Sequence, residues 1–151
     1  MDRKGLIIGW VIIGILLTTL IMLNINYKHN QRSAEQIMHN YFNQVEQKQY
    51  QKITSLLASK MLVKLSQKDY VNLLKFVNQK HGKLLKYQLQ DYKFRKKIIG
   101  ENKGNYCILL YKINYVNSVQ LQKFVLFKSN NKSKLRLLRH EFVSNTDYNK
   151  L

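Results

Sequence analysis

The side chains that could perform acid–base or nucleophilic chemistry in this chain are few and widely spaced. No two of its four histidines have the spacing of a metal site, either with each other or with the single cysteine, Cys107. His140 and Glu141 are neighbours in a predicted strand, so their side chains point to opposite faces and cannot work as a pair. Cys107 falls on the predicted core face of its strand, where a thiol packs as a small apolar group. We therefore predict no metal, no cofactor and no catalytic residue.

Ligand binding inside the folded domain would need polar residues around an interior cavity. Asp91 lies where the apolar pattern of a predicted strand slips by one residue, so its carboxylate either turns inward or lies in solvent at a bend. The tyrosines of the predicted strands either line such a cavity or fill the core, and core filling is favoured. A small enzyme using Asp91 and a cavity tyrosine is kept as an alternative. The residues that would line a cavity are Tyr87, Asp91, Tyr111, Tyr115 and His140.

Positive charge is the strongest deviation in the composition, with 26 Lys and Arg against 8 Asp and Glu and a formal net charge of +18. The charges are scattered except in YKFRKKI, where strand alternation places Lys93, Arg95 and Lys97 on one face. They either contact an anionic surface, such as lipid head groups or cell-wall polymer, or guard a solvated sheet edge against pairing. Nucleic acid is the least favoured partner, because no binding motif for it is present. The possible contacts to an anionic surface are Lys93, Arg95, Lys96, Lys97, Lys134, Arg136 and Arg139.

An apolar segment at the start of the chain determines where these residues work. Gly5 to Leu23 contains no charged residue and, as a helix, would extend roughly 28 Å, close to the hydrocarbon thickness of a bilayer. The segment is longer than the apolar part of a cleaved signal and lacks small residues at its exit. We predict an uncleaved single-span anchor in an inner or plasma membrane, with the N-terminus cytoplasmic and the remaining chain outside. The expected organisation is a tail (1–4), the anchor (5–23), a juxtamembrane linker (24–32), a folded domain (33–143) and a polar tail (144–151).

Three helices are predicted at the start of the folded domain. SAEQ has the form of a capping box and predicts that the first helix begins at Ser33. A second, short helix is expected from Tyr50 to about Ala58. SQKD predicts a third helix capped by Ser66, and Gly82 follows its last residue.

Strands follow, because after Gly82 the apolar residues recur with period two. A long first strand contains the phase slip, and GENKGN forms a hairpin turn. Three more strands are expected over Tyr106–Val116, Val119–Lys128 and Leu135–Val143. The predicted fold is α+β: a transmembrane helix followed by three helices packed on a curved four-stranded antiparallel sheet.

Several stretches resemble the nuclear-transport-factor-two-like superfamily, and in particular a bacterial membrane-anchored branch of unknown function. They are AEQIMHNYFNQVEQKQYQKITSLL, SQKDYVNLLKFVNQKHGKLLKYQL and NYCILLYKINYVNSVQLQKFVLFK, within roughly Ala34 to Val143. In the last strand Leu135 stands near the branch's Trp, and Arg139-His140 near its Gly-Tyr pair. The resemblance implies a cone-shaped, cystatin-like α+β fold that serves enzymes, protein-binding modules and scaffolds of type IV secretion machines.

Together these patterns favour a non-enzymatic single-pass membrane protein whose basic domain binds a protein partner or small ligand at the membrane. One alternative is a scaffold subunit of a type IV secretion-like or other envelope complex, which would oligomerise around its anchor. The small enzyme with a cavity carboxylate is the second alternative, since fold alone does not assign function.

Overall fold

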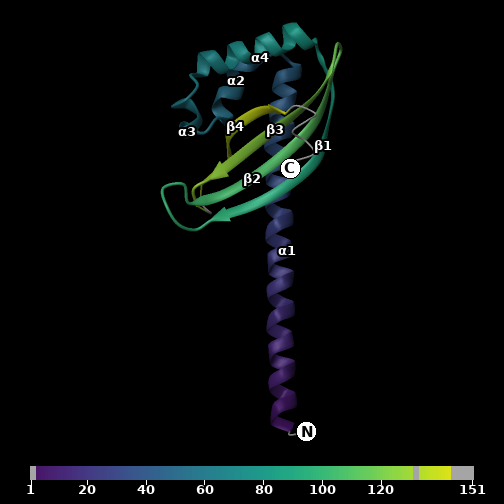
Figure 1. Cartoon of the computed structure of the whole chain (residues 1–151), viewed down its shortest axis with the longest axis vertical. Coiled ribbons are helices and arrows are strands. Elements are labelled where there is room, and N and C mark those ends of the chain that lie inside the picture. The colour runs from purple at the N-terminus through teal and green to yellow at the C-terminus, as the bar shows by residue number, and fades with distance from the viewer. Residues whose placement is uncertain (1–2, 131–132, 144–151) are drawn as a thin grey trace.

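The computed structural model describes residues 3–130 and 133–143. The predicted polar tail, 144–151, lies outside these residues, as do positions 1–2 of the predicted N-terminal tail. A single long helix, α1 (Arg3–Glu46), extends well beyond a compact group of short helices and strands (Figure 1). The predicted α+β class is confirmed, with four antiparallel strands following the helices.

By length and composition, α1 is long and apolar enough to cross a membrane. Its apolar side chains from Trp10 to Ile25 are 48% to 67% exposed, so no part of the folded domain covers them. The first buried side chain after this stretch is that of Asn30, which is 8% exposed.

The predicted helix start at Ser33 is wrong, because α1 continues through this position without interruption. Ser33 Oγ donates a hydrogen bond to the carbonyl oxygen of His29, one turn earlier, instead of capping a new helix. Residues 24–32, which we expected to form a linker, are helical and belong to α1. The exposed apolar segment and the domain therefore share one continuous helix.

Short helices follow α1: α2 (Tyr50–Ile53), the 3-10 turn η1 (Thr54–Leu56), α3 (Ser59–Leu62) and α4 (Gln67–His81). The predicted cap of α4 is confirmed, since Ser66 Oγ accepts a hydrogen bond from the backbone N–H of Asp69. Gly82 follows α4 with φ 83°, as predicted. The short helix α3 was not predicted.

The sheet has the order β1-β2-β3-β4, formed by β1 (Leu84–Lys97), β2 (Gly104–Tyr115), β3 (Val119–Lys128) and β4 (Arg136–Val143). The predicted irregularity in the first strand is confirmed by a register shift between Leu89 and Asp91. A further shift, in the β3–β4 ladder, leaves Leu138 as an extra residue between Leu137 and Arg139. Such bulges bend and twist a sheet, which allows it to wrap around the helices.

The core lies between one face of this sheet and the helices. Phe42 of α1 and Tyr70 of α4 pack there with Phe124 of β3, and all three are nearly inaccessible to solvent. Cys107 lies in the same core as a free, fully buried thiol, as predicted. Burial raises the pKa of this thiol, which keeps it protonated and unreactive.

Candidate functional site

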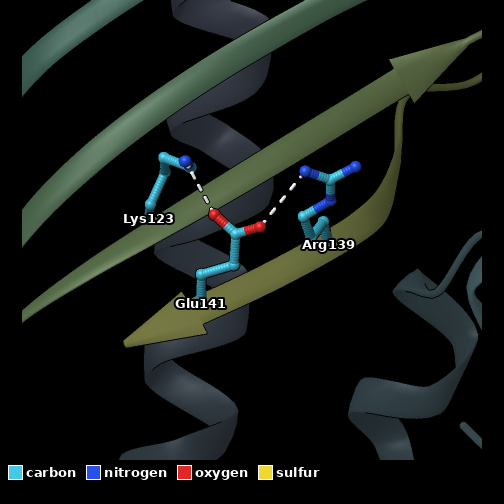
Figure 2. Close-up of polar contacts among 3 residues, drawn as sticks. All are labelled: Lys123, Arg139 and Glu141. Carbon is cyan, nitrogen blue, oxygen red and sulfur yellow. Dashed lines mark hydrogen bonds and ion pairs between the residues drawn. The ribbon is translucent and has the colours of Figure 1, made fainter. Parts of the chain in front are cut away.

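The sheet has an inner face that packs against the helices and an outer face turned away from α1. In β2, Cys107 and Leu109 point to the inner face, whereas Ile108 and Leu110 point to the outer face because successive strand residues alternate. Figure 2 looks onto the outer face, with α1 running behind the strands.

A groove of about 660 Å³ runs over the outer face. Its floor is apolar: Leu110 and Val125 are 5% and 8% exposed, and Ile108 lies beside them. Long cationic side chains surround this floor, so the groove combines an apolar base with positively charged walls. We call it the basic groove, and its lining residues are Asp91, Lys93, Arg95, Lys96, Lys97, Tyr106, Ile108, Leu110, Lys123, Val125, Leu138 and Arg139.

Two cations that line one wall of the basic groove, Lys123 and Arg139, form an ion-pair cluster with Glu141 (Figure 2). Glu141 Oε2 lies 2.7 Å from Lys123 Nζ, and its Oε1 accepts a hydrogen bond from Arg139 Nη1 at 3.2 Å. Burial alone would raise the pKa of Glu141, but its hydrogen bonds and the positive charges of Lys123 and Arg139 outweigh that effect and lower the pKa. Glu141 is therefore ionised and neutralises part of this wall.

The opposite wall, formed by β1, is less neutralised. Lys93 Nζ lies 3.3 Å from the Asp91 carboxylate. Within residues 3–130 and 133–143, Arg95, Lys96 and Lys97 have no carboxylate partner. Among the described residues, six cations line the groove, and two carboxylates pair with them: Asp91 in the lining and Glu141 beside Lys123 and Arg139. The formal sum of these eight groups is +4.

The predicted anionic-surface residues do not all lie together. Lys93, Arg95, Lys96, Lys97 and Arg139 line the basic groove. The other two lie elsewhere: the Arg136 guanidinium donates a hydrogen bond to the carbonyl oxygen of Ser55, and Lys134 lines a separate hollow beside α1. The residues predicted as one set therefore divide between two surfaces.

Polar residues inside the domain form a hydrogen-bonded chain around His140. Tyr70 Oη lies 3.2 Å from Tyr41 Oη and 3.0 Å from His140 Nδ1. His140 Nε2 lies 2.9 Å from Gln122 Oε1, and Gln122 Nε2 donates to Tyr115 Oη at 3.1 Å. Because the Gln122 oxygen can only accept, the proton of neutral His140 lies on Nε2 and its Nδ1 accepts from Tyr70.

Burial lowers the pKa of His140 to about 3, against a small opposing effect of the Glu141 charge. The ring is also stacked on Phe124, with centroids 4.4 Å apart. A cavity of only about 10 Å³ remains beside Tyr115, Gln122 and His140. That volume is close to the minimum for one water molecule, so Tyr115, Gln122 and His140 leave almost no free space among themselves.

Comparisons with models of protein families, with curated proteins and with solved structures find no match to this chain. The resemblance to the nuclear-transport-factor-two-like superfamily therefore stays a prediction.

The five residues predicted to line a cavity have different environments. Tyr115 and His140 point inward around the small cavity. Tyr111 is also buried and packs against Phe124, and together with Tyr87 it lines an open hollow of about 620 Å³ beside α1. Tyr87 is half-buried at the edge of the core, where its ring stacks on Phe42 and its hydroxyl lies 2.7 Å from His39 Nδ1. Asp91 lies on the outer face, paired with Lys93, so it does not reach the interior. In the described part of the chain, no group of three or more His, Cys, Asp and Glu side chains could hold a metal ion.

Sequence reasoning did not place Lys123 in the groove and did not predict its pairing with Glu141. The two residues are directly opposite each other in the β3–β4 ladder. Opposite charges at outward-facing positions of neighbouring strands are a known stabilising pattern. That signal becomes readable only when the strand register is known.

Proposed function

We propose that this protein is a non-enzymatic, single-pass membrane protein that uses the basic groove of its sheet to bind an anionic partner at the membrane. The observation that carries the proposal is the combination of a buried apolar floor with uncompensated positive charge on a sheet face that no helix of the described chain occupies.

The groove fits a ligand with a carboxylate or phosphate group attached to an apolar body. Ile108, Leu110 and Val125 offer the apolar part of such a ligand a surface from which water is already largely excluded. Arg95, at the rim, supplies a planar donor group suited to carboxylate and phosphate oxygens. Specific sites commonly combine an apolar lining with a few placed charges in this way.

We propose no catalysis because the polar groups inside the domain are hydrogen-bonded to one another or packed in the core. Both ring nitrogens of His140 are engaged by Tyr70 and Gln122, and its low pKa keeps it neutral. The thiol of Cys107 is protonated and packed in the core. These groups serve structure in the proposed function.

Membrane topology is the second part of the proposal. The N-terminus is proposed to be cytoplasmic, and the domain to lie outside an inner or plasma membrane. A reporter that is active only outside the cytoplasm, fused after Leu151, tests this orientation. Activity is expected, whereas an intact and inserted but inactive fusion would place the domain in the cytoplasm.

Groove binding is tested by a photoreactive amino acid at Ile108 in the full-length chain, expressed in membranes. Irradiation is expected to yield an adduct that mass spectrometry identifies as an acidic ligand or peptide. Arg95→Glu should reduce the yield at least tenfold, because it reverses an unpaired charge beside the floor. Lys75→Glu, the same charge change on the exposed side of α4, is the matched control and should leave the yield unchanged.

Equal yields from the Arg95→Glu and Lys75→Glu variants would contradict the proposal. An adduct with twice the mass of the chain would instead support the alternative of a scaffold subunit. An adduct formed equally well by a photoreactive group at Val116, at the other end of the sheet, would mean that the groove has no selectivity.

A further inference from the structure

We infer that the turn between β1 and β2, residues 98–103, is a second membrane contact that inserts Ile98 and Ile99 into the surface of an anionic bilayer. The inference concerns a different surface from the floor of the basic groove and does not depend on ligand binding there. It requires that the turn lies at the height of the bilayer surface, that its chemistry fits lipid, and that it is ordered.

The height of the turn is fixed by α1. Tyr27, just beyond the exposed apolar segment, donates a hydrogen bond to the carbonyl oxygen of Tyr92 in β1, with the two oxygens 3.1 Å apart. One turn further along α1, Asn30 Oδ1 accepts a hydrogen bond from Lys128 Nζ at the end of β3. Tyrosine is enriched at the water interface of membrane helices, so this end of the sheet lies next to the bilayer surface.

β1 continues from Tyr92 toward the membrane. In Figure 1 the strand runs downward as it approaches Lys97, and the turn after it forms the lower edge of the domain, on the side of the exposed apolar part of α1. Five residues of strand separate Tyr92 from Lys97, a length of roughly 17 Å. The turn is therefore displaced sideways from α1 and faces the same bilayer surface.

The chemistry of the turn matches an anionic lipid surface. Ile98 and Ile99 are 74% and 83% exposed, among the most exposed large apolar side chains outside α1. Lys96, Lys97 and Lys103 flank them against the single carboxylate of Glu101. Adjacent lysines would meet lipid phosphates while the isoleucines enter the apolar boundary below, an arrangement typical of membrane-surface segments.

The turn is held in place from within the protein, so its apolar tip is presented in an ordered form. Lys60 Nζ of α3 donates hydrogen bonds to the carbonyl oxygen of Glu101 and to Asn102 Oδ1, at 3.3 Å and 2.9 Å. Tyr106 Oη donates to the carbonyl oxygen of Asn102 at 2.6 Å. Insertion consequently needs little additional ordering of the chain.

The test places a polarity-sensitive fluorophore on the full-length protein in lipid vesicles, at Ile99→Cys in one variant and at Val116→Cys in another. Val116 is the matched control, because it is also an exposed aliphatic residue but lies beyond the opposite end of β2. Cys107 is fully buried and does not compete for label. Vesicles are either neutral or contain about one third anionic lipid, with brominated acyl chains as a depth-sensitive quencher.

In anionic vesicles we expect the fluorescence emission of the label at position 99 to shift to shorter wavelength and to be quenched by the brominated lipid. The emission of the label at position 116 should keep the wavelength that it has in water and should not be quenched. Replacing Lys103, which does not line the basic groove, by Gln should weaken the anionic-lipid dependence by about fivefold. Quenching at Ile99 no greater than at Val116 would overturn the inference, as would equal quenching in neutral and anionic vesicles. Neither result would affect photoadduct formation at Ile108. The test therefore distinguishes failure of the membrane-insertion proposal from failure of the groove-binding proposal.

Discussion

Tyr27 of α1 and Tyr92 of β1 join the apolar helix to the sheet through two contacts at once. The Tyr27 hydroxyl donates to the Tyr92 carbonyl oxygen, and the two rings meet edge to face with centroids 5.2 Å apart. The sheet is thus tied to α1 at the position where the helix leaves its exposed apolar segment.

Separating the two contacts gives the first prediction. Tyr27→Phe keeps the ring and should lower the free energy of unfolding by about 1 kcal/mol, the net value of one hydrogen bond. Tyr27→Ala should cost a further ~1 kcal/mol, because the edge-to-face contact is also lost. Thermal unfolding of the full chain in detergent, with amide exchange of the peptide around Tyr92, measures both effects. A Phe variant as stable as the parent would show that the hydrogen bond contributes nothing.

Acid sensitivity gives the second prediction. The pKa of His140 is about 3 in the folded protein against 6.5 for a free histidine, so the unfolded chain binds this proton first as the pH falls. Stability should therefore decrease below about pH 6.5, by up to ~1.4 kcal/mol per pH unit, until about pH 3. Denaturant unfolding at pH 7, 6 and 5 measures the slope.

The control for this titration is His140→Gln, which has no titrating side chain. The decrease between pH 6.5 and 5 should disappear in this variant, even if its stability at pH 7 is lower. Glu141 acts in a separate range, because its lowered pKa affects stability only as the pH falls below the 4.5 of a free carboxyl. An unchanged slope in the Gln variant would assign the acid sensitivity to other groups.

Neutralising Glu141 gives the third prediction. Glu141→Gln frees Lys123 and Arg139 and raises the formal charge of the basic groove by one. The yield of the Ile108 photoadduct should rise, while stability changes by no more than about 1 kcal/mol because the ion pairs are partly exposed. Glu46→Gln makes the same charge change at the C-terminal end of α1, where the side chain is exposed, and should alter neither the adduct yield nor the stability. A lower adduct yield from Glu141→Gln would mean that the cluster positions its cations rather than neutralising them.

Two glycines near the β1–β2 turn give the fourth prediction. A Cβ added at Gly104 would lie 2.6 Å from the carbonyl oxygen of Lys128 and 2.5 Å from the Phe127 ring, and φ is 150° there. Gly104→Ala should therefore cost at least about 2 kcal/mol. Gly100 has φ 91° but open space around it, so Gly100→Ala should cost only about 1 kcal/mol. Equal losses in thermal unfolding would show that backbone strain, and not the steric clash, dominates at both positions.

Sequence reasoning identified the strands and the helix α4 because each has a local signal. The Ser66 cap and the alternation along Val119–Lys128 depend only on neighbouring residues. The same kind of local signal led to a wrong prediction at Ser33, because there the capping-box sequence lies inside a longer helix. The inward-facing residues Asn30, Ala34, Met38 and Tyr41 continue the helical spacing through that position, but the polar Asn and the small Ala hid the pattern.

The basic groove could be only partly predicted. Alternation alone placed Lys93 and Arg95 on one face, since it acts within a single strand. The contribution of Lys123 and Glu141 depends on the register between β3 and β4, which a bulge at Leu138 shifts by one residue. Long-range pairing of this kind has no local sequence signal.

Because α1 is unbroken between the apolar segment and the domain, the domain cannot rotate freely relative to that segment. Each residue of an α-helix advances about 1.5 Å and turns about 100°. A single residue inserted at 24–26 would therefore lift the sheet slightly and rotate it by more than a quarter turn about the axis of α1. Four inserted residues would turn the domain about 400°, to within about 40° of its original direction, at a greater height. The direction in which the basic groove faces along the membrane plane is therefore set by the number of residues in α1 between the apolar segment and the domain.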